Sequence, residues 1–218
     1  VETDVSEVPI FRMPGLDERG TPVEQRYPRP GDPNARWTLK VVGAGGGEPV
    51  PMQVEGEYLV SAGWLRSGSV WLRPADRLQK QLSPYLCDPA TGEASRWFAQ
   101  ESPAWVELDD GLRFLDDDRC LFVAGQQILL GHRASPGFAG NSTPRYSREV
   151  AGIAGVSAGR LVAFTRAAGD ALGLDLCLLD LADGSERALR TGGWRSVEPN
   201  ADCSRFVETA SRAGEPPR

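Results

Sequence analysis

A repeat of about 45 residues constrains the fold of this chain more than any other feature. Three segments share a polar turn, an arginine and then a short apolar strand, and their arginines, Arg119, Arg160 and Arg205, lie 41 and 45 residues apart. A second series, in which an apolar strand ends in an aspartate and a tight turn, occurs at Asp88 and again at Asp180, 92 residues or two periods later. Short strands that recur with this period are typical of β-propeller blades, each a four-stranded antiparallel sheet.

The repeat predicts an all-β fold: a β-propeller segment with about three complete four-stranded blades and two partial ones. No stretch of helical length keeps an apolar stripe at helical spacing, so helices are not expected. A generic β-sandwich is the alternative fold. The complete blades are expected at 57–104, 105–149 and 150–193, and the partial ones at 1–56 and 194–218.

The blade at 57–104 shows the plan most clearly. Its third and fourth strands flank a turn at 88–93, where Gly92 can supply the positive φ that a tight hairpin needs. The strands of this blade are expected at 58–65, 69–73, 82–87 and 95–99. In the partial blade before it, strands are expected at 8–12, 36–42 and 50–54.

Charge and hydropathy exclude several classes of protein. The 218 residues carry 24 Lys and Arg against 30 Asp and Glu, a formal net charge of −6. This balance argues against nucleic acid as a partner, because phosphate binding needs a basic surface. No apolar run approaches the roughly 20 residues that span a bilayer, so no membrane segment is expected. Because Val1 begins neither an initiator methionine nor a signal sequence, we expect a soluble piece of a longer protein, with periplasm and cytoplasm both open as its compartment.

The four cysteines are predicted to be buried thiols. Cys87, Cys120, Cys177 and Cys203 each lie in an apolar run, and no two of them form a C-x-x-C pair. With His132 as the only histidine, a zinc site would lack its usual ligands. A disulfide stays open as the alternative.

One segment matches the G-x-S-x-G pattern of a nucleophile elbow, with Ser157 at its centre. The elbow needs a strand before the serine and a helix after it, whereas a β-like run follows Ser157. We therefore interpret this segment as the tip of a β-hairpin. His132 lies where a strand runs into a turn, and no complete Ser-His-Asp triad is evident.

Acidic residues cluster at 109–110 and 116–118, and their carboxylates could in principle hold calcium. Neither cluster has the alternating ligands, the glycine and the closing glutamate of a calcium loop, and carboxylates are also common in β-turns. We therefore predict no metal site and no cofactor.

Several segments, in order along the chain, resemble the propeller of the dipeptidyl peptidase IV family of serine peptidases, within the prolyl oligopeptidase family. The most specific is 26–34, where a strand ends in a proline-rich run with Tyr-Pro, a basic residue, Gly and Asn. The matching segments are 2–14, 25–36, 85–92, 101–106, 110–115 and 193–206, so the resemblance extends over essentially the whole chain.

The resemblance implies what the protein does. Members of the family release dipeptides with proline or alanine in second position from the amino end of peptides, using a serine, an aspartate and a histidine on an α/β-hydrolase domain. Their propeller restricts access to the active site and supplies two adjacent glutamates that bind the substrate ammonium group. This sequence contains no adjacent pair of glutamates and no hydrolase domain, so no catalytic residue is assigned.

The only candidates for contact with substrate lie in the loop after Trp105: Glu107, Leu108 and Asp109, with an ordinary inter-strand loop as the alternative. The leading hypothesis is a non-catalytic propeller portion of a serine exopeptidase that gates its active site. Its expected partners are the hydrolase domain of the same chain, peptide substrates and, in addition, a second subunit in a homodimer. The alternatives are a stand-alone propeller that binds proteins without enzymatic activity, and a hydrolase that uses Ser157.

Overall fold

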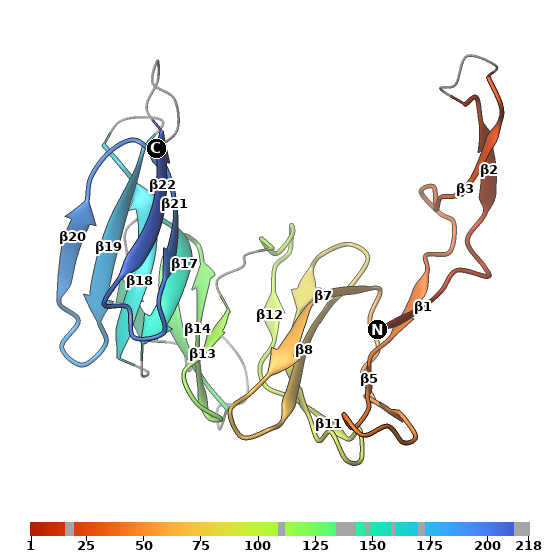
Figure 1. The fold of residues 1–218 in the computed structure, drawn as a ribbon, viewed down its shortest axis with the longest axis horizontal. Coiled ribbons are helices and arrows are strands. Elements are labelled where there is room, and N and C mark those ends of the chain that lie inside the picture. The colour runs from red at the N-terminus through yellow and green to blue at the C-terminus, as the bar shows by residue number, and fades with distance from the viewer. Residues whose placement is uncertain are drawn as a thin grey trace. The chain divides into compact units, whose positions relative to one another are not determined.

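The computed structural model of the chain describes residues 1–15, 20–108, 112–133, 143–146, 149–157, 160–169 and 173–211. Every regular element in these residues is a β-strand, which confirms the all-β prediction. Nowhere in these ranges is there a helix long and apolar enough to cross a membrane. The chain divides into two compact units (Figure 1). The first unit comprises 1–64, 68–96 and 101–105, and the second comprises 65–67, 97–100 and 106–218.

Three antiparallel two-stranded ladders form the N-terminal part of the first unit. The ladders pair β1 with β4, β2 with β3, and β5 with β6. The strands are β1 (Glu2–Asp4), β2 (Ile10–Met13), β3 (Val23–Arg26), β4 (Arg36–Thr38), β5 (Lys40–Val41) and β6 (Val50–Pro51). The strand expected at 8–12 therefore forms a separate hairpin with 23–26, a pairing that the sequence pattern did not indicate.

A larger antiparallel sheet follows in the order β7-β8-β10-β11, and β9 and β12 extend it. Its third and fourth strands are each divided in two, and Pro84 separates β9 from β10 because proline has no N–H for the ladder. The strands are β7 (Tyr58–Trp64), β8 (Val70–Ala75), β9 (Gln81–Leu82), β10 (Tyr85–Cys87), β11 (Ala94–Arg96) and β12 (Gln100–Glu101). Leu72 and Cys87 of this sheet pack with Leu39 and Met52 in the core of the first unit.

The second unit contains two four-stranded antiparallel sheets and a hairpin. The sheets have the orders β13-β14-β15-β16 and β17-β18-β19-β20, and the hairpin pairs β21 with β22. The strands are β13 (Arg113–Phe114), β14 (Arg119–Ala124), β15 (Gln127–His132), β16 (Thr143–Tyr146), β17 (Val150–Ser157), β18 (Leu161–Ala167), β19 (Leu174–Asp180), β20 (Glu186–Arg190), β21 (Trp194–Pro199) and β22 (Phe206–Ser211).

Sheet β17–β20 is covered on both faces. Its Val162, Phe164, Cys177 and Leu179 face sheet β13–β16 and share one apolar core with Leu121, Ile128 and Leu130. Its Ala163 and Leu178 face the other way and pack with Cys203 and Phe206 of the C-terminal hairpin. Burial on both faces explains why β19 is a nearly continuous apolar run, in contrast to the exposed edge strand β20. The sheets are therefore stacked face to face, as Figure 1 shows for this unit.

The arginine repeat marks the same place in successive sheets. Arg119 is the first residue of β14, Arg160 directly precedes β18, and Arg205 directly precedes β22. Strands β14, β18 and β22 are each the second strand of their sheet or hairpin. The sequence repeat is thus a structural repeat.

The turns that follow Asp88 and Asp180 have the same backbone hydrogen bond. The carbonyl of Asp88 accepts a hydrogen bond from the Gly92 N–H at 2.8 Å, and that of Asp180 accepts one from Gly184 at 2.9 Å. Asp180 is the last residue of the third strand of its sheet, and Asp88 directly follows the third strand of its own. The two glycines have φ of 75° and 74°, which confirms the positive φ predicted for Gly92.

Candidate functional site

Ser157 does not lie in a nucleophile elbow. It is the last residue of β17 and pairs with Leu161 at the start of β18, so a strand and not a helix follows it. Its carbonyl accepts a hydrogen bond from the Arg160 N–H at 2.8 Å, and the residue is only 7% exposed. The hairpin interpretation is confirmed. His132 ends β15 opposite Arg119 of β14, where a strand end was predicted.

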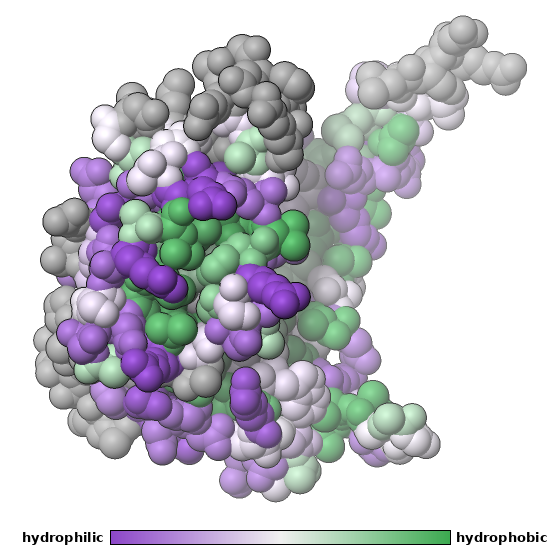
Figure 2. Space-filling view, turned by 60° about the vertical axis from the view of Figure 1, so that its left-hand side comes forward, coloured by the Kyte–Doolittle hydropathy of each residue, from purple (hydrophilic) through white to green (hydrophobic). Residues whose placement is uncertain are grey.

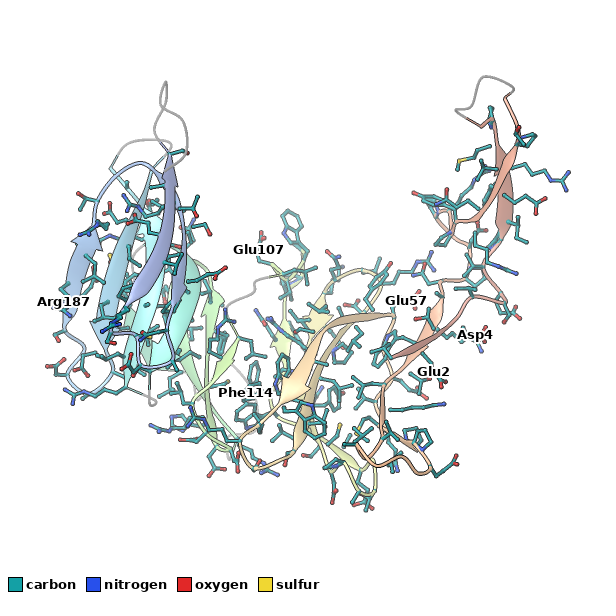
Figure 3. The ribbon with its side chains drawn as sticks, viewed as in Figure 1. Glu2, Asp4, Glu57, Glu107, Phe114 and Arg187 are labelled. Carbon is teal, nitrogen blue, oxygen red and sulfur yellow. The ribbon has the colours of Figure 1, made fainter. Side chains whose placement is uncertain are left out.

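The loop with the predicted substrate contacts leaves two of its side chains open to solvent. Val106 is buried, whereas Glu107 is exposed and Leu108 is 50% exposed; Figure 3 labels Glu107. Asp109 lies outside the described residues. Nothing in the structure tests a contact of Glu107, Leu108 or Asp109 with substrate, so their role stays a prediction.

The hairpin of β2 and β3 exposes both of its faces. Seven of its eight residues are exposed, and Ile10, Met13 and Val23 are among the large apolar side chains in contact with solvent. Such exposed apolar side chains are typical of surfaces that bind another protein when they occur together.

The base of this hairpin is anchored by one arginine. Nη1 of Arg26 donates to the carbonyl oxygens of Val5 at 2.8 Å, Ser6 at 3.2 Å and Val8 at 2.7 Å. The guanidinium of Arg29 lies 3.8 Å from the ring centroid of Phe11. These two arginines belong to the segment that carries the most specific part of the family resemblance, and here they hold the chain in place.

The following residues of the same segment are bound to the larger sheet of the first unit. Nδ2 of Asn34 donates to Oε1 of Glu57 at 2.7 Å, and Nη1 of Arg77 donates to the Asp32 carbonyl at 2.7 Å. Arg77 also forms an ion pair with Glu57 at 3.3 Å. The position of Glu57 is marked in Figure 3. The segment at 29–34 is therefore a structural clasp within this unit.

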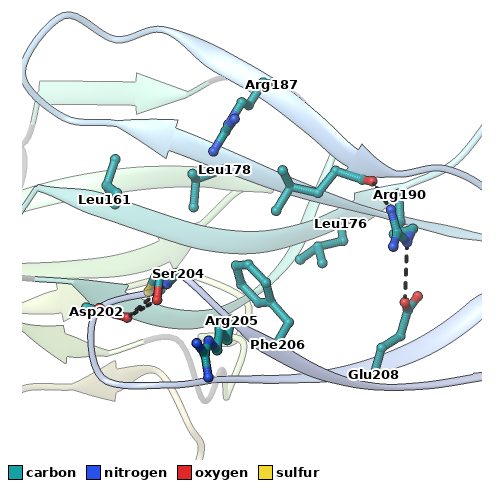
Figure 4. Close-up of a pocket in the computed structure, with 12 residues that line it drawn as sticks. Leu161, Leu176, Leu178, Arg187, Arg190, Asp202, Ser204, Arg205, Phe206 and Glu208 are labelled. Atoms are coloured by element: carbon teal, nitrogen blue, oxygen red, sulfur yellow. Dashed lines mark hydrogen bonds and ion pairs between the residues drawn. The ribbon is translucent and has the colours of Figure 1, made fainter.

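A groove of about 780 Å³ lies between sheet β17–β20 and the β21–β22 hairpin (Figure 4). Leucines of the sheet and Phe206 of β22 form its apolar lining, and Arg187 and Arg190 of β20 lie at its side. Glu208 of β22 forms an ion pair with Arg190 at 3.7 Å and a second one with Arg195. The apolar lining consists of Leu161, Leu176, Leu178, Leu189, Cys203 and Phe206. Sequence reasoning missed this groove, and the alternation of Leu176 and Leu178 along β19 was its only local signal.

All four cysteines are free and buried, as predicted. Burial raises the pKa of Cys87 and of Cys177 to about 11, because a thiolate is poorly solvated there. These thiols are therefore unsuited to act as nucleophiles or metal ligands. In the described ranges, no three His, Cys, Asp or Glu side chains gather as a metal site would require.

The fold and the sequence repeat together define the class of protein to which this chain belongs. Stacked four-stranded antiparallel sheets with a common period make this chain a segment of a β-propeller, as predicted. Residues 1–127 match the model of the dipeptidyl peptidase IV (DPP IV) N-terminal region. The chain belongs to this family.

Solved structures agree with the fold. The chain is similar to dipeptidyl peptidase 4 from Porphyromonas gingivalis, with a TM-score of 0.82 and 19% identity over 99% of this chain and 32% of the other. It is also similar to a Bacteroides ovatus protein assigned as a dipeptidyl aminopeptidase IV, with a TM-score of 0.78 and 16% identity over 96% of this chain and 34% of the other. The chain thus spans about a third of the length of these two structures. No curated protein sequence matches it.

Proposed function

We propose that this chain is the non-catalytic propeller portion of a serine exopeptidase that releases N-terminal X-Pro and X-Ala dipeptides. The observation that carries the proposal is the match of residues 1–127 to the DPP IV N-terminal region, in a chain with the propeller fold over nearly its whole length. The hairpin position of Ser157 supports a non-catalytic role, because it removes the only elbow-like motif of the chain from consideration.

In this function the propeller gates access to the active site and docks to the α/β-hydrolase domain of the same polypeptide. Glu107, Leu108 and Asp109 line the path of the peptide substrate. The exposure of Glu107 and Leu108 supports this role, because a carboxylate and an apolar side chain on one loop can bind an extended peptide. The complete blades of this portion extend over 57–104, 105–149 and 150–193, and the partial ones over 1–56 and 194–218.

The second subunit of a homodimer is the proposed partner of the β2–β3 hairpin. The exposed side chains of Ile10, Met13 and Val23 support this assignment, since a twofold contact can bury the same apolar residues of both copies. The clamp of Arg26 on three carbonyls keeps the hairpin base rigid, which lowers the entropy lost on association.

The gating role is tested in the natural gene product by comparing a short substrate with a long one. We expect Glu107→Gln and Leu108→Ala to change kcat/KM for a peptide of about ten residues at least threefold, and to change it little for Gly-Pro-p-nitroanilide, which is too short to reach a gate. Leu78→Ala, at an exposed leucine of the first unit, is the control and should change neither. Equal effects of all three variants on both substrates would contradict the role of the loop.

The two alternatives give different results in the same assay. A stand-alone binding module would show no dipeptide release by any product of the gene. A hydrolase that uses Ser157 would show release by the 218-residue chain alone, and Ser157→Ala would abolish it. We expect the 218-residue chain to be inactive.

A further inference from the structure

Two tryptophans of the first unit are equally exposed at opposite ends of its large sheet. Trp64 and Trp105 are each 62% exposed. Trp64 ends β7 and pairs with Val70 at the start of β8. Trp105 follows β12 at the other end of the sheet, where the N–H of Ser102 donates to the carbonyl of Lys80 at 3.0 Å. Lys80 directly precedes β9, which pairs with the last residue of β8. The two indoles therefore present similar apolar surface in different places.

Short-range contacts hold the loop that carries Trp105. The N–H of Ala104 donates to Oγ of Ser102 at 3.3 Å, and Pro103 between them has a restricted φ. On the other side of Trp105, Val106 is buried. Because the chain is held on both sides of the tryptophan, little backbone entropy is lost when a ligand packs on its ring.

The turn between β8 and β9, to which this loop is bonded, is held by hydrogen bonds of its own. Oδ1 of Asp76 accepts a hydrogen bond from the Gln81 N–H at 2.7 Å. Arg77 in the same turn donates to the Asp32 carbonyl at 2.7 Å. The carbonyl of Lys80 therefore gives the loop after β12 a fixed point of attachment.

A second aromatic side chain lies at the same end of the sheet. Tyr58 begins β7, pairs with Ala75 at the end of β8, and is 40% exposed. Its hydroxyl accepts a hydrogen bond from Nδ2 of Asn34 at 3.1 Å, which restrains the ring. β8 and β9 lie between β7 and β12, so these two outer strands are about 14 Å apart. Polyproline II rises about 3.1 Å per residue, so about four or five residues of such a peptide extend from one strand to the other.

The apolar surface of the second unit is of another kind. Apolar side chains gather there on the side that Figure 2 turns forward, with hydrophilic side chains around them. The groove of that unit is lined mainly by leucines. Tyr58 and Trp105 are aromatic instead, and Trp105 precedes Glu107 and Leu108 by two and three residues. The indole is thus continuous in sequence with the loop that the proposed function assigns to the substrate path.

An exposed indole on a fixed loop is well suited to bind the ring of a proline. Proline has no N–H, so its ring can cover the indole without burying an unpaired donor. A peptide in the polyproline II conformation has no internal hydrogen bonds to break and loses little freedom on binding, and aromatic side chains recognise such peptides for this reason. The chemistry of this end of the sheet therefore fits a proline-rich peptide.

We propose that Trp105 is a specificity-determining residue that packs on a proline of the peptide substrate beyond the dipeptide that is released, while Tyr58 contacts the same stretch of peptide. The inference rests on the proposed function, because the peptide that passes the neighbouring loop is the substrate proposed there. It goes beyond that function by naming the class of peptide that the propeller selects, which is peptides with prolines downstream of the cleaved bond.

The test uses the natural gene product that contains these 218 residues and two peptides of about ten residues that both begin with Gly-Pro-Ala-Gly. One peptide has prolines at positions five to eight, and the other has alanines there. Release of Gly-Pro gives kcat and KM for each peptide. Binding is measured by fluorescence anisotropy with the same peptides acetylated at the amino end, which removes the ammonium group that cleavage requires.

We expect kcat/KM for the proline peptide to exceed that for the alanine peptide about threefold or more through a lower KM, because a contact far from the cleaved bond is made equally in the ground state and the transition state. Trp105→Ala should abolish the preference, and Trp105→Phe, which keeps an aromatic face, should keep most of it. Trp64→Ala, at the other end of the sheet, is the matched control and should keep it in full. Because both tryptophans are exposed, the variants should fold, which the circular dichroism spectrum checks.

Three results would overturn the proposal. The first is equal kcat/KM and equal binding of the two peptides by the unchanged protein, and the second is an undiminished preference in Trp105→Ala. The third is an equal loss of activity of Trp105→Ala on both peptides and on Gly-Pro-p-nitroanilide, since the tryptophan would then pack against another domain. Failure of the proposed function would appear instead as a gene product without dipeptide release, and the anisotropy of the acetylated peptides would still show whether Trp105 binds proline.

Discussion

The hydroxyl of Tyr146 on β16 accepts a hydrogen bond from Nη1 of Arg166 on β18 at 2.5 Å, and so joins two neighbouring sheets of the second unit. Nη1 also donates to Oε1 of Glu186 at 2.6 Å, and the Tyr146 ring lies 4.8 Å from that of Phe164 between their centroids. A polar contact at the edge of an apolar interface fixes how the two sheets are aligned, because breaking it leaves partly buried groups unpaired.

Removing this hydroxyl should destabilise the second unit. Tyr146→Phe keeps the ring and leaves Arg166 short of one acceptor, so we expect the free energy of unfolding in urea to fall by about 1–2 kcal/mol. Tyr27→Phe, at a tyrosine that is 58% exposed, is the control and should change stability by less than about 0.5 kcal/mol. Equal effects of the two variants would show that the hydrogen bond between Tyr146 and Arg166 contributes nothing to stability.

The thiols should be unreactive until the chain unfolds. Burial raises the pKa of Cys87 and Cys177 to about 11, so at pH 8 nearly all of each is protonated and shielded from solvent. An aromatic disulfide reagent, which forms a mixed disulfide with a thiol and releases a coloured thiolate, should label none of the four cysteines quickly in the native chain, and all four in guanidinium chloride. Rapid labelling of the native chain, or fewer than four thiols after unfolding without reductant, would contradict the free and buried state.

The two equivalent turn glycines should differ in their tolerance of alanine. Gly92 and Gly184 share a left-handed φ, but a Cβ on Gly92 would lie 2.1 Å from the carbonyl oxygen of Pro51, whereas one on Gly184 meets nothing within 4 Å. We expect Gly184→Ala to lower the free energy of unfolding by about 1 kcal/mol, because alanine is strained at this positive φ. Gly92→Ala should lower the free energy of unfolding by at least about 2 kcal/mol, because the Pro51 carbonyl must move as well. Hydrogen exchange of each sheet measures the two costs separately, and a larger cost at Gly184 would refute this account.

The hairpin base should loosen when its arginine is removed. Arg26→Met keeps the apolar stem and leaves the carbonyls of Val5, Ser6 and Val8 without their donor, so we expect limited proteolysis to cleave before residue 26 at least about threefold faster. Arg12→Met removes an exposed ion pair with Glu24 in the same hairpin and is the matched control. Cleavage at the same rate in both variants would mean that the clamp does not hold the hairpin.

Much of the second unit could be predicted from the sequence, for a physical reason. Arg119, Arg160 and Arg205 mark the start of second strands, and Asp180 marks the end of a third strand, as Asp88 does in the first unit, because each turn depends on hydrogen bonds between residues close in sequence. Local geometry of this kind leaves a pattern that recurs with the repeat.

The β2–β3 hairpin could not be predicted in the same way. β3 reads Val-Glu-Gln-Arg and β2 reads Ile-Phe-Arg-Met, and neither strand has the alternation of a half-buried strand because both faces are exposed. Its anchor at Arg26 binds carbonyl oxygens, and a carbonyl is present at every residue and so leaves no signal in the sequence. The groove near Arg187 was missed for a related reason, since it depends on how the β21–β22 hairpin packs on sheet β17–β20.

Dipeptide release by the natural gene product that contains these 218 residues tests the central claim most directly. The assay uses Gly-Pro-p-nitroanilide with and without a fluorophosphonate that blocks catalytic serines, and includes the 218-residue chain alone. The account predicts release by the gene product that the inhibitor abolishes, and no release by the 218-residue chain. A gene product without release, or release by the 218-residue chain alone, would contradict it.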